Sequence, residues 1–277
     1  MLNVVRVGII GTVLLSGIWG QRPSLVHQVP PPPANAFKNA VITSDHPLCT
    51  ELGVEVMRNR GGTAVDAAIV VLFCIGVVHN QLSGIGGGGV MLVKRFSPPS
   101  DTGETQEEVI DFRETAPAAA HQYMFKERPN DARFSGRAVA VPAELNGLYY
   151  AYRRYRRYRN TELTWSALLQ PVIALCEEGF AVSEKLHEAL KEHWSDMPEA
   201  LRRHYADASG QPLQAGKMMK RPHLGQTLRA VADDPDAEKD TDEPIPGAPK
   251  AFYTDMAPSL VSTIKAANGI MTVEDLA

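Results

Sequence analysis

The feature that most constrains this 277-residue chain is a run of glycine, since five of the six residues from 84 to 89 are glycine. Glycine loses more conformational freedom on folding than any other residue, so such a run indicates backbone that must turn freely or be approached closely. An apolar stretch precedes the run, the strand-like segment 90–96 follows it, and a charged cluster stands at 111–117. Together these features predict a site that grips an anionic small molecule beside close-packed backbone.

Residues 84–89 also satisfy the dinucleotide-binding pattern G-x-G-x-x-G. That pattern requires a strand before it and a helix after it, so that the helix N-terminus meets the pyrophosphate. Here a helical pattern comes first and a strand-like segment follows, which disfavours nucleotide binding. Close packing of helix against sheet stays open as the reason for the glycines. Ser83 lacks the preceding glycine of the G-x-S-x-G nucleophile motif, so we interpret it as part of the loop.

Two helices are predicted before the glycines. Thr63 and Asp66 form a helix start, with the Thr63 side chain as cap and the carboxylate near the positive end of the helix dipole. Apolar residues follow at helical spacing through residue 73, and an earlier helix with apolar residues at 48, 52 and 56 ends at the glycines 61–62. Packed as an antiparallel hairpin, the two helices would bring Cys49 close to Cys74.

The remaining elements have weaker signals. Segments 90–96 and 109–112 are predicted to pair as strands, and helices are predicted at 143–157, 166–178, 183–192 and 253–267. A hydrophobic content of 44% is ordinary for a globular domain of this length. Neither H-E-x-x-H nor paired C-x-x-C occurs, so no metal site is predicted.

A run of arginine and tyrosine at 153–159 resembles a nucleic-acid patch with interleaved aromatic residues. The alternative is a helix end whose cations complement the dipole and whose tyrosines pack inward. The net charge of −4 does not favour a polyanionic partner, so no nucleic-acid partner is predicted.

Several segments, in the same order along the chain, resemble the N-terminal part of the large subunit of γ-glutamyltransferases (γ-glutamyltranspeptidases, glutathione hydrolases). The resemblance spans roughly residues 39–277, except for a divergent piece near 221–250. The segments that carry it are 48–93, 113–117, 139–144, 171–175, 178–180, 251–253 and 269–276.

The resemblance implies an α+β fold, the αββα sandwich of N-terminal-nucleophile hydrolases. In this family a precursor cuts itself into a large and a small subunit, and the threonine that begins the small subunit attacks the γ-glutamyl amide of glutathione. No cofactor is implied. No residue of this chain matches that threonine, so we expect an incomplete large-subunit domain at 39–277 that is inactive alone, with exposed strand edges and marginal solubility. The alternative is a catalytically inactive truncated relative that acts as a binding or regulatory subunit.

The resemblance also assigns two substrate contacts. Arg113 matches the arginine that binds the α-carboxylate of the γ-glutamyl group, and a guanidinium suits this role because it donates two charge-assisted hydrogen bonds to a carboxylate. Glu114 matches a neighbouring acidic position that orients groups in the pocket. The alternative for Arg113 is a surface ion pair with Glu114 or Asp111, which contributes little. The implied partners are glutathione or another γ-glutamyl compound and the small subunit of the same precursor.

Cys49 and Cys74 match a cysteine pair that animal members of the family join as a disulfide. The alternative is two reduced core cysteines in a cytosolic protein, so the compartment decides between them. Cys176 lies on an apolar helix and is expected to be a buried free thiol.

The N-terminus bears on the compartment. Arg6 precedes thirteen mostly apolar residues, 7–19, so residues 1–20 are predicted to be a signal peptide or, as in animal members of the resembled family, a type II membrane anchor. Residues 21–38, with four consecutive prolines, are predicted to be a semi-rigid spacer. Either route places the protein in the secretory pathway, at the cell surface or secreted. The sequence contains no N-x-S/T glycosylation site.

Residues 233–249 are acidic and rich in proline. This composition is typical of an exposed loop, and the resemblance weakens over the same residues, so we predict a flexible insertion there.

Overall fold

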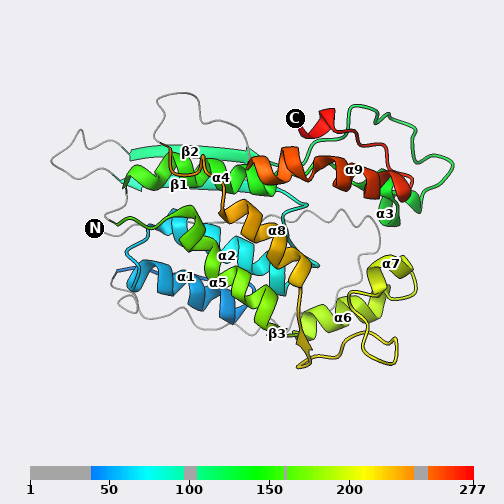
Figure 1. The fold of residues 1–277 in the computed structure, drawn as a ribbon, viewed down its shortest axis with the longest axis horizontal. Helices are drawn as coiled ribbons and strands as arrows, with labels where there is room; N and C mark the ends of the chain where they lie inside the picture. The colour runs from blue at the N-terminus through cyan, green and yellow to red at the C-terminus, as the bar shows by residue number, and fades with distance from the viewer. Residues whose placement is uncertain (1–38, 97–104, 159–160, 240–248) are drawn as a thin grey trace, which may run out of the picture.

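The computed structural model describes residues 39–96, 105–158, 161–239 and 249–277 (Figure 1). The predicted leader 1–20 and spacer 21–38 lie outside these ranges. The described helices and strands, in chain order, are α1 (Pro47–Arg58), α2 (Ala64–Val78), β1 (Gly89–Phe96), β2 (Thr105–Phe112), α3 (Asp131–Phe134), η1 (Gly136–Ala138), α4 (Glu144–Tyr155), η2 (Arg156–Tyr158), α5 (Trp165–Glu178), β3 (Phe180–Ala181), α6 (Glu184–His193), α7 (Glu199–Arg202), β4 (Met218–Met219), α8 (Pro222–Ala232), η3 (Ala251–Asp255), α9 (Ala257–Ala266) and η4 (Glu274–Leu276).

The predicted helical hairpin is confirmed as α1 and α2. Thr63 caps α2 in a reciprocal capping box with Asp66, because each side chain accepts a hydrogen bond from the other residue's backbone N–H. Every residue of α2 after Ala64 is buried, so this helix forms the centre of the core. Cys49 of α1 and Cys74 of α2 have Cα atoms 5.4 Å apart and are joined by a disulfide.

α5 and α8 complete the helical layer. Trp165, at the start of α5, is fully buried and contacts Phe73, Tyr149 and Tyr152 with ring centroids 5.1–5.7 Å apart. Its indole Nε1 donates to the carbonyl oxygen of Val231 at 3.0 Å, which joins α5 to α8. The disulfide joins α1 to α2, Phe73 joins α2 to α5 through the Trp165 ring, and the indole joins α5 to α8. We call these four helices, α1, α2, α5 and α8, the helical base.

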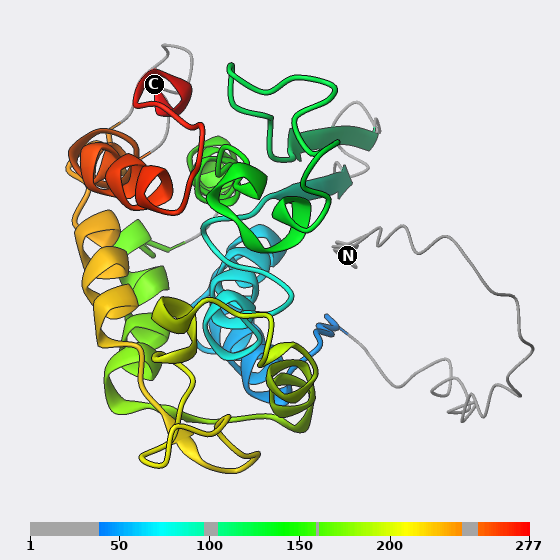
Figure 2. The same ribbon diagram turned by 90° about the vertical axis from the view of Figure 1, so that its right-hand side faces the viewer.

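The predicted strand pair is also confirmed. β1 and β2 are antiparallel from Gly89↔Phe112 to Phe96↔Thr105, so the second strand begins four residues earlier than predicted. Alternation places Met91, Val93 and Ile110 on a buried face. The opposite face, which we call the outer face, carries Val90, Leu92 and Val109, which are 42–63% exposed. Figure 2 shows the two strands at one side of the molecule with α4 beside them.

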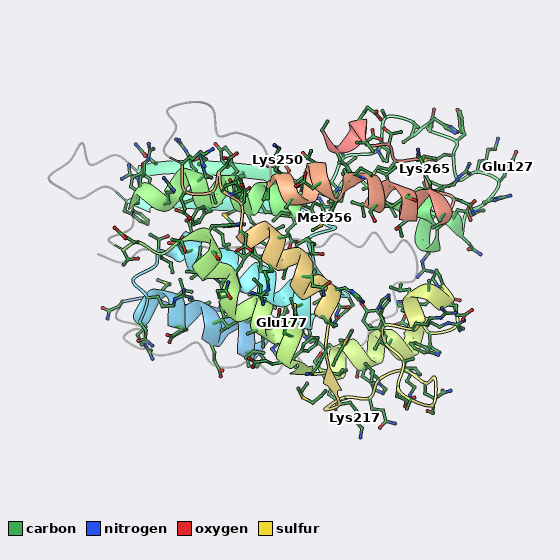
Figure 3. The ribbon with its side chains drawn as sticks, viewed as in Figure 1. Glu127, Glu177, Lys217, Lys250, Met256 and Lys265 are labelled. Atoms are coloured by element: carbon green, nitrogen blue, oxygen red, sulfur yellow. A yellow bond between two sulfur atoms is a disulfide. The ribbon has the colours of Figure 1, made fainter. Side chains whose placement is uncertain are left out.

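Two sequence predictions were wrong about α-helices. The helix predicted at 253–267 is divided: residues of η3 form a π-helical turn, Met256 lies at the junction (Figure 3), and α9 begins at Ala257. Pro258 is the reason, since proline favours the first turn of a helix and cannot continue one. The sequence analysis missed α8, which begins at Pro222. The helices predicted at 143–157, 166–178 and 183–192 are confirmed as α4 with η2, α5 and α6, with boundaries that differ by at most one residue.

Residues 233–239 are mostly exposed but anchored, while 240–248 lie outside the described residues. Ala237 is 2% exposed. Glu238 accepts hydrogen bonds from the Trp165 backbone and from Arg156, and the Arg153 guanidinium donates to a carbonyl oxygen of the same segment. Arg153 of α4 and Arg156 of η2 therefore bind this segment, and within the predicted insertion 233–249 these first seven residues are held in place.

Hydrogen bonds join the segment after β2 to the C-terminal residues of the chain. The Asp275 carboxylate accepts hydrogen bonds from the backbone N–H of Ala118 at 2.7 Å and of Thr272 at 2.8 Å. Nearby, the Gly136 N–H donates to the carbonyl oxygen of Ala267 at 2.8 Å. The segment after β2 is thus fastened to residues far away in sequence.

Candidate functional site

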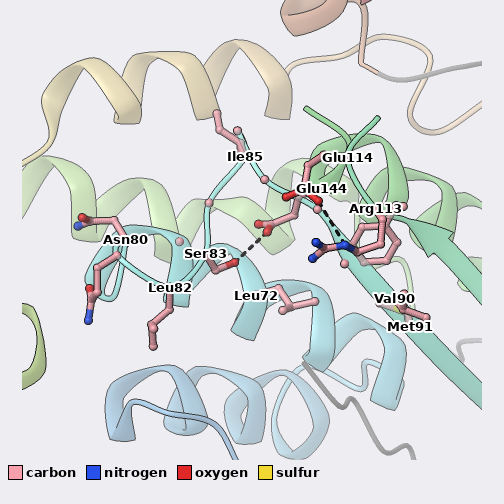
Figure 4. A pocket seen from close by; sticks show the side chains of 18 of the residues that line it. Leu72, Asn80, Leu82, Ser83, Ile85, Val90, Met91, Arg113, Glu114 and Glu144 are labelled. Atoms are coloured by element: carbon pink, nitrogen blue, oxygen red, sulfur yellow. Dashed lines mark hydrogen bonds and ion pairs between the residues drawn. The ribbon is translucent and has the colours of Figure 1, made fainter. Parts of the chain in front are cut away.

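A cavity of about 820 Å³ follows the glycine turn, defined here as residues 83–88 (Figure 4). The end of α2, the turn, the start of β1, the segment after β2 and the start of α4 surround it. Its lining residues are Leu72, Gly76, Asn80, Gln81, Leu82, Ser83, Gly84, Ile85, Gly86, Gly87, Gly88, Gly89, Val90, Met91, Leu92, Phe112, Arg113, Glu114, Glu144, Tyr205, Arg221 and Leu224.

The glycines permit close approach on two sides. A Cβ atom added to Gly88 would lie 2.2 Å from the carbonyl oxygen of Phe112, and one added to Gly76 of α2 would lie 2.9 Å from the Cα of Gly84. Neither position leaves room for a side chain, so close packing accounts for Gly88 and for the contact of Gly84 with α2, whereas a Cβ added to Gly86 would meet nothing within 4 Å. The turn also stands between a helix and a strand in the order opposite to that of a dinucleotide site.

Arg113 follows β2 directly and lines the cavity. Its side chain is 59% exposed, and Nε lies 3.4 Å from Oε2 of Glu114. Within the described part of the chain, neither Nη atom has a hydrogen-bond partner. The two Nη groups, whose parallel N–H bonds suit a carboxylate, are therefore available in the cavity. Among the described residues, the charged partner of Arg113 is Glu114, through a long and partly solvated ion pair of the kind that contributes little to stability.

Glu114 folds back over the glycine turn. Its side chain is 22% exposed, and a Cβ added to Gly88 would lie 3.1 Å from its Oε2. The two residues assigned by resemblance are thus brought together on one wall of the cavity, where the glycines make room for the carboxylate.

Glu144 is a site residue that the sequence analysis did not single out. It is the first residue of α4, is 2% exposed, and its Oε2 accepts a hydrogen bond from the Ser83 hydroxyl at 2.8 Å. Its Oε1 is buried without a hydrogen-bond partner among the described residues. Burial raises the pKa of Glu144 from 4.5 to about 7, and the nearby Glu114 adds to the rise, while hydrogen bonds from Ser83 and the Gly84 N–H oppose it. In sequence, an acidic residue in a first helical turn is ordinary, so nothing there signals burial.

Ser83 lies beside the Glu144 carboxyl. Its hydroxyl donates to Glu144, a carboxyl group that burial disposes to keep its own proton. The buried His79 lies elsewhere, where its Nε2 is 2.8 Å from the Ser183 hydroxyl and its ring packs edge-on against His46. The interpretation of Ser83 as a loop residue agrees with these contacts, because an activated serine needs a base within hydrogen-bond reach.

The far end of the cavity is built from different groups. Tyr205 donates to Oδ1 of Asn80 at 2.8 Å, and Arg221 donates from Nη1 to the Gly76 carbonyl oxygen at 3.0 Å. Figure 4 shows Asn80 and Arg113 at opposite ends, with Ser83 and Ile85 between them. Arg221 therefore complements the C-terminal end of α2, where a cation is favourable.

Other sequence predictions can be located. Cys176 is a buried free thiol, as predicted, and burial raises its pKa to about 11. Across the described ranges, no cluster of three or more histidine, cysteine or carboxylate side chains could hold a metal ion. In the same ranges, no helix has the length and apolar character needed to cross a membrane.

Comparison with known proteins gives consistent findings. The family model described as Gamma-glutamyltranspeptidase matches residues 49–277. The chain is 37% identical over 243 residues to Scoloptoxin SSD14 from Scolopendra dehaani and 34% identical over 240 residues to Glutathione hydrolase proenzyme 2 from Schizosaccharomyces pombe. These alignments cover 87% and 86% of this chain but only 38% and 35% of the two relatives, so the chain spans little more than a third of their length.

Among solved structures, the chain resembles the gamma-glutamyltranspeptidase of Helicobacter pylori with a TM-score of 0.72 and 28% identity. That likeness covers 88% of this chain and 65% of the bacterial one.

Proposed function

Because this chain belongs to the gamma-glutamyltranspeptidase family, we propose that it forms the glutamate-binding part of an enzyme that transfers or hydrolyses γ-glutamyl groups. Its fold is the α+β fold of these N-terminal-nucleophile hydrolases, with the glycine turn and β1 at the cavity. Glutathione is the expected donor, since several relatives 34–37% identical to this chain are glutathione hydrolases.

The observation that carries the proposal is the open fork of Arg113. A guanidinium whose Nη atoms lack partners among the described residues, on a cavity of about 820 Å³, can bind a carboxylate through two parallel hydrogen bonds. In the proposed complex this is the α-carboxylate of the γ-glutamyl group, and Glu114 orients neighbouring groups. Glutathione is small enough for a cavity of this size.

The chemical step needs a nucleophile that we propose comes from the small subunit. There a threonine hydroxyl attacks the γ-carbonyl carbon while the freed α-amine takes its proton; the C–N bond then breaks, and the proton passes to the departing amine. Water or an acceptor amine next releases the glutamyl group. Among the residues that line the described cavity, Ser83 and Tyr205 carry hydroxyls; Ser83 donates to the buried Glu144 carboxyl and Tyr205 to Oδ1 of Asn80.

The outer face of β1 and β2 supports an obligatory partner. Val90, Leu92 and Val109 are adjacent across the strand pair and largely exposed. The same face also carries the charged residues Lys94, Glu107 and Asp111, so the apolar part is a patch with a polar edge. An exposed apolar patch of this kind is typical of a surface that a partner covers. We propose that the small subunit provides that layer.

We also propose a secretory location, at the cell surface or secreted. A disulfide between two fully buried cysteines persists in an oxidising compartment, and the apolar segment 7–19 suits a signal peptide or anchor.

The test is binding of glutathione to this chain by calorimetry, compared with the analogue that lacks only the α-carboxylate. Wild-type protein should prefer glutathione, and Arg113→Lys should weaken its binding by about tenfold or more, since lysine cannot donate in the bidentate geometry. Arg95→Lys, on β1 outside the cavity, is the matched control. Equal binding of both ligands, or an unchanged Arg113→Lys variant, contradicts the proposal.

Activity separates the enzyme from the alternative of a non-catalytic binding subunit. Co-expression with a family small subunit should yield glutathione hydrolysis if the chain completes an enzyme. Glutathione binding that persists without hydrolysis in an assembled complex would favour the binding subunit.

A further inference from the structure

The contacts of residue 144 with the glycine turn are made by both its backbone and its side chain. The Glu144 N–H donates to the Gly87 carbonyl oxygen at 2.8 Å, and its Oε2 accepts from the Ser83 hydroxyl at 2.8 Å, while the Gly84 backbone also favours the charged carboxylate. The turn is closed within itself by the Gly87 N–H, which donates to the Gly84 carbonyl oxygen at 2.8 Å. One residue of α4 therefore holds both ends of the turn.

The Glu144 carboxyl lies between the cavity and a small apolar void. It borders a void of about 10 Å³ that is otherwise lined by Phe73, Gly76, Val77, Ile85, Leu224 and Leu228. A water molecule needs at least this much room and two or more polar partners, and these side chains offer none. The buried, unpartnered Oε1 is therefore not hydrated through this void.

Two ionisable groups face this carboxyl. Glu114, from the segment after β2, disfavours a negative charge on it, and Tyr253, from η3, is itself held neutral because burial raises its pKa to about 12. The residues of α2 and α8 that border the void are apolar or glycine. A charge on Glu144 would thus lie in an apolar space beside a second carboxylate, which is far more costly than a neutral O–H without a partner.

We propose that Glu144 is a positioning residue whose neutral carboxylic acid clamps the glycine turn against α4. Oε2 accepts from the Ser83 hydroxyl, and the proton resides on Oε1. The glycine turn also supports residues 112–114 of the cavity wall, because Gly88 packs directly against the Phe112 carbonyl and the Glu114 backbone. This inference deepens the proposed function and rests on it only in identifying residues 112–114 as the glutamate site.

The consequence is a clamp that weakens as pH rises. Since the proton is bound more tightly in the folded than in the unfolded chain, the stabilisation is greatest in acid and declines between pH 4.5 and about 7. Between pH 5 and 8 the folding equilibrium constant of wild type, relative to Glu144→Gln, should fall on the order of a hundredfold. Glutamine keeps the shape and the neutral state but does not titrate.

The direct experiment is carbon NMR of the chain labelled at the glutamate side-chain carboxyl. One resonance should titrate near pH 7 and be absent from Glu144→Gln. Glu108→Gln is the matched control, because Glu108 accepts from Tyr155 and Tyr150 and its pKa is lowered; it should remove a different resonance. A Glu144 resonance that titrates in the ordinary carboxylate range overturns the proposal.

Amide hydrogen exchange tests the clamp itself. Glu144→Ala should speed exchange of the turn amides by about tenfold, because two hydrogen bonds are lost, whereas Glu144→Gln should stay near wild type. Equal protection in wild type and Glu144→Ala would show that the side chain positions nothing. Neither readout uses a γ-glutamyl ligand, so failure here is distinguishable from failure of the proposed function.

Discussion

The helical base and the outer face of the sheet differ in how they treat apolar side chains: the base buries them, and the outer face leaves them exposed. In the base, Trp165 is fully buried and its indole N–H is satisfied, while a disulfide ties α1 to α2. On the outer face, Leu92 and Val109 are 45% and 63% exposed and cover nothing within the described chain. The difference indicates that the base supplies stability, whereas the sheet, the glycine turn and Arg113 remain open for contact with ligand or partner.

The largest effect should come from the centre of the base. Trp165→Ala should lower the free energy of unfolding by about 3–5 kcal/mol, because it leaves a cavity and removes the hydrogen bond from the indole to the Val231 carbonyl. Trp165→Phe, which keeps most of the ring volume, should cost less and remain measurable if the alanine variant does not fold. The half-buried Trp194 is the control, and urea unfolding is the measurement. An equal loss in Trp194→Ala would argue against a dominant base.

Removal of the disulfide should have the next effect. Cys49→Ala with Cys74→Ala opens a link between residues 25 apart and should cost about 3–4 kcal/mol on the chain-entropy estimate. Reductant should destabilise wild type and leave the double variant unchanged, as followed by urea midpoints. Cys176→Ala, a buried thiol without a bond, is the control. If reductant leaves the urea midpoint of wild type unchanged, the disulfide does not form in solution.

The two regions should respond to pH in opposite directions. Burial lowers the pKa of His46 and His79, so the unfolded chain binds the proton more tightly and the base loses stability as pH falls below 6.5. His79 also faces Lys185, which lowers its pKa, and Asp45, which raises it. At the glycine turn, Glu144 has the opposite sign.

Variants separate the pH dependence of stability that the histidines cause from the one that Glu144 causes. Between pH 5 and 7, Glu144→Gln should gain stability with rising pH, since the histidines remain. His46→Gln with His79→Gln should instead lose stability over the same range, because Glu144 remains. The carboxylates with lowered pKa act below this window. Thermal melts at each pH provide the measurement, and parallel curves for the two variants would refute the opposition.

The smallest change in stability is expected on the outer face. Val109→Thr and Leu92→Thr should alter the free energy of unfolding by less than about 0.5–1 kcal/mol, because exposed sheet positions contribute little. Their effect should appear as weaker self-association in sedimentation experiments. Val93→Thr, on the buried face of the same strand, should destabilise clearly. Unchanged association would mean that the outer face is not a contact surface.

The sequence predicts the base better than the site. Capping at Thr63, apolar spacing and the positions of Cys49 and Cys74 are local signals, and each is confirmed. α8 was missed because it has few large apolar residues and because the resemblance to γ-glutamyltransferases weakens near residues 221–250. The break at Met256 was missed although Pro258 marks it.

The site divides in the same way. Arg113 and Glu114 were found through a resemblance, and the structure places both on the cavity; their binding roles stay predictions. Glu144 escaped notice because its character depends on burial by α2 and α8, which lie far from it in sequence. Burial of this kind is a property of tertiary packing and leaves no local signal.

The tie between Ala118 and Asp275 has a consequence for the order of assembly during synthesis. The helical hairpin of the base emerges early and can collapse as soon as α1 and α2 are made. The segment that leaves Arg113 cannot be fastened until Asp275 has been synthesised, since that carboxylate holds the Ala118 N–H. A nascent chain that has not yet reached Asp275 therefore carries a formed α1–α2 hairpin and an unfinished cavity wall.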